Sequence, residues 1–136
     1  MTTIRNQTTF LRRVLIADAV AGAVAGAVLL GAAGPLADVL ALPAALLRYA
    51  GLALLPVAAF ILFIATRPQP PRAAVWAIIV VNALWTVESV LLLLSGWVHP
   101  NLPGQIFVVA QALMVAGFAE LEFIGLRRTA PRAVAA

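Results

Sequence analysis

Three polar residues stand inside long apolar stretches of the chain, where they could bind protons, cations or a polar ligand. Asn82 and Glu88 belong to one stretch, and Gln111 belongs to the next. An ionisable or polar group inside a membrane is costly, so each is a candidate functional residue. At the helical rise, Glu88 and Gln111 fall at similar depths on antiparallel neighbours. A neutral Glu88 donating a hydrogen bond to the Gln111 carbonyl would satisfy both groups, and we expect a candidate intramembrane polar site at Glu88, Asn82 and Gln111.

The remaining acids of the apolar stretches lie close to arginines at their ends. Asp18 follows an arginine pair, and Glu120 and Glu122 precede another. Two residues apart on a helix, Glu120 and Glu122 point away from each other and make no ready pair for acid–base chemistry. Arginine side chains can reach back along a helix toward such groups near a membrane interface. We therefore expect interfacial ion pairing of Asp18, Glu120 and Glu122 with Arg12, Arg13 and Arg127.

The sequence contains none of the common catalytic or metal-binding motifs. There is no cysteine and a single histidine, His99, which lies beside Pro100 in a predicted turn. Nucleophile elbows, zinc-protease helices, phosphate-binding loops and di-iron motifs are all missing. We expect no catalytic activity, no metal site and no cofactor.

The elements that must position these residues are four apolar helices. Hydrophobic residues make up 64% of the 136-residue chain and charged residues 10%, against about 45–50% and about 25% in a soluble domain. A spanning helix needs about 20 apolar residues. Breaks at Gly34-Pro35, at 67–72 and at 98–104 predict helices over about 12–33, 43–66, 73–97 and 105–127. The expected fold is an all-α membrane protein, one integral membrane domain over 1–136 forming a four-transmembrane-helix bundle. A cleaved signal peptide is the alternative for the first run, whose length favours a retained helix.

The arginines predict the orientation of the bundle. Eight of them fall on one side if four helices cross, and only Arg48 falls near the other. The eight are Arg5, Arg12, Arg13, Arg67, Arg72, Arg127, Arg128 and Arg132. Positively charged residues concentrate on the cytoplasmic side of a membrane protein, so both termini are expected in the cytoplasm. The lysine-free, alanine-rich composition is typical of a bacterial gene, and we expect a multi-pass protein of the bacterial inner membrane.

The first helix carries a stripe of small residues. Gly22 and Gly26 form a G-x-x-x-G motif with small neighbours, which lets two helix backbones approach closely. We expect Gly22 and Gly26 to pack helix one inside its own bundle. The alternative is a contact between copies of the chain.

Two functions from different classes remain open. The first is a structural, accessory or self-associating membrane component without catalytic activity. The second is a small oligomeric carrier or channel for protons, cations or a small molecule, using the intramembrane residues named above. A water-accessible cavity at Glu88 would favour the carrier, whereas a buried and paired Glu88 would favour the structural component. The expected partners are the lipid bilayer and either further copies of the chain or a larger membrane protein. Nucleic acid is not expected, because the arginines form short clusters rather than a basic face with stacking aromatics.

Overall fold

The computed structural model describes residues 2–129, with side chains from Asn6 onward, as helices joined by short connections. Arg132 and the side chain of Arg5 lie outside the described residues. Four of the helices are long and apolar enough to cross a membrane, and the predicted all-helical class is confirmed. The elements are α1 (Thr2–Gly31), α2 (Ala33–Leu40), α3 (Ala44–Ala65), α4 (Arg72–Leu94) and α5 (Leu102–Arg128).

The additional helix, α2, occupies most of the connection expected between the first two apolar helices. The chain leaves α1 at Gly31 and re-enters a helix at Ala33. Pro35 lies in the first turn of α2, where its missing N–H costs no hydrogen bond. The left-handed conformation of Ala41, with φ of 53°, ends α2. The Gly34-Pro35 pair therefore lies inside the first turn of α2, and the break between the two helices falls just before it, at Ala32.

The other helix ends follow local capping chemistry. Pro43 and Pro71 are the N-caps of α3 and α4. Gly96 has a φ of 74°, which glycine adopts without steric cost, and it turns the chain away after α4. Asn101 caps α5, because its side-chain oxygen accepts a hydrogen bond of 2.9 Å from the Gly104 N–H.

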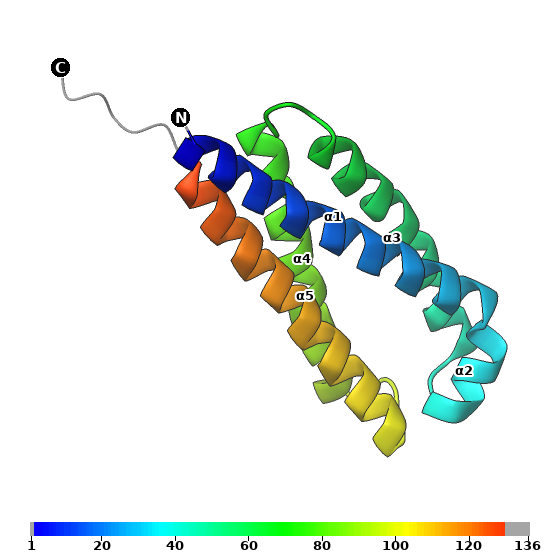
Figure 1. Ribbon diagram of the computed structural model, residues 1–136. Helices are drawn as coiled ribbons and strands as arrows, with labels where there is room; N and C mark the ends of the chain where they lie inside the picture. The colour runs from blue at the N-terminus through cyan, green and yellow to red at the C-terminus, as the bar shows by residue number, and fades with distance from the viewer. Residues whose placement is uncertain (1, 130–136) are drawn as a thin grey trace.

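The long helices form two antiparallel pairs, α1 with α3 and α4 with α5 (Figure 1). Gly51 in α3 explains how closely the first pair packs, since a Cβ there would lie 2.7 Å from the Gly26 carbonyl oxygen. Gly22 is less crowded, and a Cβ on it would meet the Ala58 Cβ at 3.5 Å. α1 also packs against α5, whereas α3 and α4 make few contacts with each other. The two pairs are thus joined mainly through α1 and α5.

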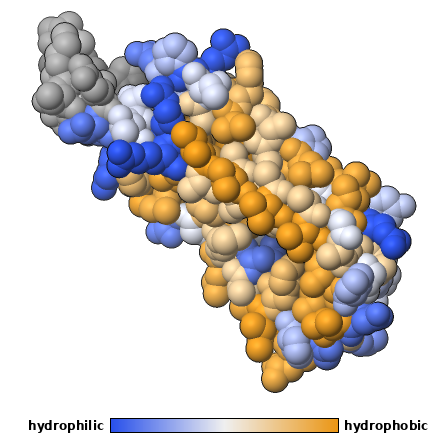
Figure 2. Space-filling view, turned by 45° about the vertical axis from the view of Figure 1, so that its right-hand side comes forward, coloured by the Kyte–Doolittle hydropathy of each residue, from blue (hydrophilic) through white to orange (hydrophobic). Residues whose placement is uncertain are grey.

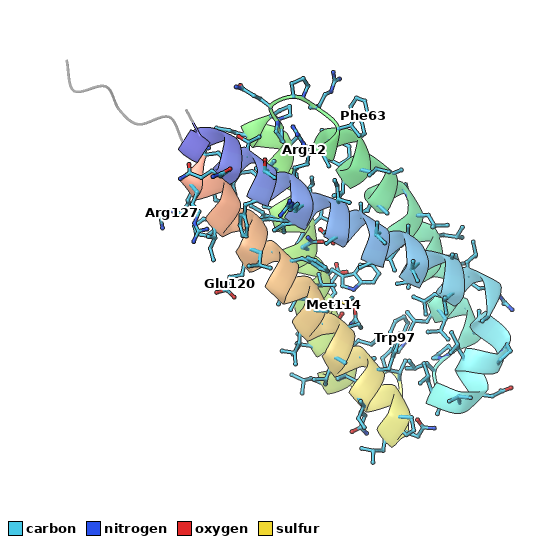
Figure 3. The ribbon with its side chains drawn as sticks, in the orientation of Figure 1. Arg12, Phe63, Trp97, Met114, Glu120 and Arg127 are labelled. Carbon is cyan, nitrogen blue, oxygen red and sulfur yellow. The ribbon has the colours of Figure 1, made fainter. Side chains whose placement is uncertain are left out.

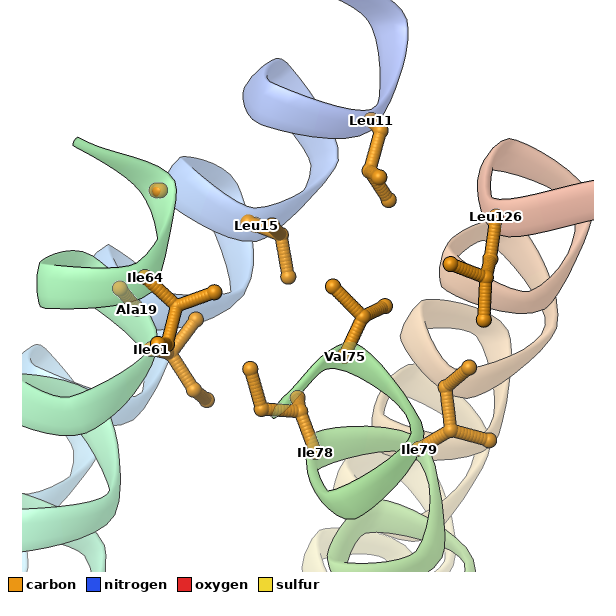
Figure 4. Close-up of a cluster of buried hydrophobic side chains, with 10 residues drawn as sticks. Leu11, Leu15, Ala19, Ile61, Ile64, Val75, Ile78, Ile79 and Leu126 are labelled. Atoms are coloured by element: carbon orange, nitrogen blue, oxygen red, sulfur yellow. The ribbon is translucent and has the colours of Figure 1, made fainter. Parts of the chain in front are cut away.

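One end of the molecule, here called the arginine end, has a hydrophobic cluster to which all four long helices contribute. Figure 4 shows these side chains facing one another at the point where the helix pairs meet. Arg12 closes the same end by donating to the carbonyl oxygens of Ala65, Arg67 and Pro68 at 3.0, 2.9 and 3.0 Å. The cluster comprises Leu11, Leu15, Ala19, Ile61, Ile64, Ala65, Val75, Ile78, Ile79 and Leu126.

At the opposite end the helix pairs diverge, and α2 lies between them (Figure 1). Asn101 Nδ2 donates to the Val39 carbonyl at 2.8 Å, which ties α2 to the start of α5. Gly104 lets the two elements meet, because a Cβ there would collide with the Leu40 carbonyl. Figure 2 shows hydrophobic side chains over the middle of one face, hydrophilic ones mainly toward the ends, and one hydrophilic patch recessed between them.

Candidate functional site

A cavity of about 870 Å³ lies between the two helix pairs. Side chains of α1 and α3 form one wall, and side chains of α4 and α5 form the other. Two of the lining residues, Met114 of α5 and Trp97 of the connection before it, are labelled in Figure 3. Tyr49 on α3 and Leu91 on α4 border the cavity and are 71% and 56% exposed. Because α3 and α4 make few contacts, the cavity opens sideways between these two helices.

The floor of the cavity, toward the arginine end, is a buried polar cluster. Asn82 Nδ2 donates to Asp18 Oδ2 at 2.8 Å and to Glu122 Oε2 at 3.2 Å. All three side chains are buried, and Glu122 is 0% exposed. Asp18 and Asn82 face the cavity, whereas Glu122 lies behind them. We call these three residues the carboxyl cluster; they come from α1, α4 and α5 and hold three helices together.

The Asp18 and Glu122 carboxyl groups lie close together, because both accept from the same Asn82 nitrogen. Two carboxylates side by side repel each other, and a proton held by one of them removes that repulsion. The pair is therefore a candidate acid–base group at the floor of the cavity. This is acid–base capacity without a neighbouring nucleophile.

A second polar group forms the wall of the cavity. Trp85 Nε1 donates to Gln111 Oε1 at 2.8 Å, and Gln111 Nε2 donates to Ser89 Oγ at 2.9 Å. The Ser89 hydroxyl in turn donates to the Trp85 backbone carbonyl at 2.7 Å. This chain of bonds joins α4 to α5 and uses both ends of the Gln111 amide.

Glu88 borders the same cavity but belongs to neither polar group. Its side chain is exposed, and among the described residues it has no hydrogen-bond or ion-pair partner. The expected hydrogen bond between Glu88 and Gln111 is thus not formed, since Trp85 and Ser89 occupy the Gln111 amide. Asn82 and Gln111 do border one cavity with Glu88, but Asn82 is bonded to the carboxyl cluster. The reason is the helix face: Asn82, Trp85 and Ser89 repeat at the helical period on one face of α4, and Glu88 stands at the edge of that face.

The interfacial ion pairs expected for Asp18 and Glu122 require a correction. Both carboxyl groups turn inward to Asn82, while the Arg12 side chain binds backbone carbonyls and the Arg127 guanidinium lies over the Phe123 ring, 5.6 Å from its centre. The expectation considered only how far each acid lies from the end of its helix, and that distance does not determine which face of the helix the residue occupies. Arg13 and Glu120 are exposed, and Glu120 points away from the bundle in Figure 3.

Trp85 and Ser89 are candidate-site residues that were not expected from the sequence. Their spacing of four from one another, and of three and seven from Asn82, repeats at the helical period. That period was the signal for a shared inward face. The bonding partner of each could not be read from it.

The described residues offer little to a metal ion. Within 6–129, no group of three or more histidine, cysteine, aspartate or glutamate side chains could hold one. His99 is exposed in the connection between α4 and α5. The site as described provides two hydrogen-bonded carboxyl groups, one free carboxyl group, amides and aromatic rings around an apolar space.

No protein-family model, no curated protein and no solved structure matches this chain.

Proposed function

We propose that this chain is a multi-pass membrane protein that binds a small molecule in the cavity between its two helix pairs. The four long apolar helices support the membrane location. The observation that carries the binding function is the cavity of about 870 Å³, a volume within the range of about 300–1,000 Å³ that drug-sized ligands occupy. Its lining combines apolar walls with a few polar groups, the composition typical of ligand sites.

The cavity favours the carrier over the structural component. A component that only fills or braces a membrane complex needs no unfilled space, and close packing stabilises its core. Glu88 borders the cavity and has no described partner, which is the arrangement expected of a binding protein. The sideways opening between α3 and α4 gives an apolar ligand a route from the lipid. Assembly with further copies of the chain is compatible with this function.

The proposed setting is the bacterial inner membrane, with both termini in the cytoplasm. Among the seven arginines whose side chains are described, Arg48 alone lies near the α2 end, and the others gather at the arginine end. An arginine-rich end belongs on the cytoplasmic side. The cavity would then open in the outer half of the membrane.

We propose a binding rather than an enzymatic role. The Ser89 hydroxyl, the one hydroxyl of the polar wall, donates to a backbone carbonyl and accepts from Gln111. A serine nucleophile requires an adjacent general base instead. The carboxyl cluster supports proton-linked binding, since it places two acids that share one donor at the floor of the cavity.

Native mass spectrometry of the protein released from detergent tests the binding function. Ala53 is exposed, lies on α3 and borders the cavity, so Ala53→Phe places a ring in the ligand space. Ala59 is exposed on the same helix away from the cavity, so Ala59→Phe is the matched control. We expect the parent and Ala59→Phe to carry a bound small molecule that Ala53→Phe has lost. Equal spectra for all three proteins, without added mass, would contradict the proposal.

A further inference from the structure

We propose that the ligand of this cavity is a lipophilic cation, with its positive charge at Glu88 and its apolar body between α3 and α4. This inference rests on the proposed binding function and assigns the chemical class of the ligand. It follows from the charges, the rings and the free carboxyl group that border the cavity.

The ionisable side chains that border the cavity are of one sign. Asp18 lies at its floor and Glu88 on its wall, and neither an arginine nor the histidine is among the described residues that line it. An anionic ligand would meet two acids without a counter-charge, whereas a cation would meet complementary charge. Among apolar side chains this charge complementarity strongly favours a cationic over an anionic ligand, because an unpaired charge is costly there.

Glu88, rather than Asp18, is the residue with capacity for a ligand. The Asp18 carboxyl group is buried and already accepts a hydrogen bond from Asn82. Glu88 has no described partner, although it stands among apolar side chains in the second half of α4. A carboxylate in that position is stabilised by a bound cation. Six residues separate it from Asn82, which places it about 9 Å nearer the α2 end at the helical rise.

The aromatic rings of the lining favour the same class of ligand. Tyr49, Trp85, Trp97, Phe107 and Phe118 all border the cavity. Aromatic faces attract cations, and the attraction is stronger where the contact is desolvated. The walls between the rings are aliphatic, so a small inorganic cation would leave most of the space unfilled. A bulky organic cation satisfies the charge, the rings and the volume together.

Equilibrium binding of radiolabelled tetraphenylphosphonium to the detergent-solubilised protein, with empty micelles subtracted, tests the proposal. Tetraphenylborate, which has the same shape and the opposite charge, is the probe control. We expect the parent to bind the phosphonium and not the borate, and Glu88→Gln to weaken phosphonium binding at least tenfold. Glu120→Gln removes the same charge from an exposed position outside the cavity, and we expect it to bind like the parent.

Two results would overturn the assignment. Equal affinity for the borate, or parental affinity in Glu88→Gln, would show that charge at Glu88 does not select the ligand. Either result would leave the small-molecule site itself intact, because that site is judged by the masses carried by Ala53→Phe and Ala59→Phe. Folding of Glu88→Gln is checked by its gel-filtration profile and helical circular dichroism, so lost binding is not confused with lost structure.

Discussion

Asn82 in α4 and Asp18 in α1 are hydrogen-bonded at 2.8 Å, although 64 positions separate them in the chain. The same Asn82 nitrogen also contacts Glu122 in α5. One amide therefore satisfies acids from two other helices in a buried place. At this position hydrogen bonds join the α1–α3 pair to the α4–α5 pair, in addition to the hydrophobic contacts between them.

Replacing Asn82 with leucine, which has a similar size, should destabilise the protein by about 1–3 kcal/mol, because two buried carboxyl groups lose their common donor. Val80→Leu, at an exposed position of the same helix, is the control and should change little. The measurement is the free energy of unfolding in mixed micelles. If the two variants are equally stable, the carboxyl cluster does not hold the helices together.

Gly51→Ala should destabilise the protein by about 1–3 kcal/mol, as expected of overpacking. Its Cβ would lie 2.7 Å from the Gly26 carbonyl oxygen and 2.9 Å from the Leu30 nitrogen, both of them backbone atoms. Gly117→Ala is a matched control inside α5, where a Cβ meets nothing within 4 Å. That variant should gain about 0.5–1 kcal/mol, because alanine favours the helix. Thermal unfolding of both proteins checks the prediction, and a Gly51→Ala protein as stable as the parent would refute close packing of α1 on α3.

Gln111→Leu and Glu88→Leu should differ in stability. Gln111→Leu removes the acceptor of the Trp85 indole N–H and should cost about 1 kcal/mol. Glu88 has no described partner, so Glu88→Leu should stay within about 0.5 kcal/mol of the parent. Chemical denaturation followed by tryptophan fluorescence measures both. A larger loss in Glu88→Leu than in Gln111→Leu would mean that Glu88 has a structural partner.

Reporter fusions test the proposed orientation. A green fluorescent protein joined after Ala136 should fluoresce, because that end is expected in the cytoplasm with the arginine end. Alkaline phosphatase joined after His99, in the exposed connection before α5, should be active, because that connection is expected outside. Activity of the phosphatase at Ala136 together with its inactivity at His99 would reverse the assignment.

Much of the fold could be predicted from the sequence, because apolar length and helix-breaking residues are local signals. The connection through Pro68, Pro70 and Pro71 lies where expected, whereas α4 ends at Leu94, three residues before the predicted end at 97. α2 was missed, since eight residues containing Gly34 and Pro35 look like a break rather than a helix. Its contacts with α5 are tertiary, and no local pattern reveals them.

The candidate site was predicted only in part, for a reason that differs between residues. Asn82 and Gln111 were identified because polar residues among apolar ones stand out on a helix. Asp18 and Glu122 were assigned to the interface because each lies near arginines in the sequence. Asp18 nevertheless follows Leu11 and Leu15 at the helical period, and both are buried. The position of Asp18 within the helical period therefore indicated that it lies on the buried face, which its distance from the end of the helix did not indicate.

α2 acts as a spacer between the ends of the two helix pairs (Figure 1). Side chains from all four long helices join the two pairs at the arginine end, and the pairs diverge toward the other end (Figure 1). α2 lies between the diverging ends and is tied to α5 by the Asn101 to Val39 bond. It contacts α1 and α3 on one side and α5 on the other. Because α2 contributes none of the side chains that line the cavity, its size can change in evolution or design without changing the chemistry of the lining.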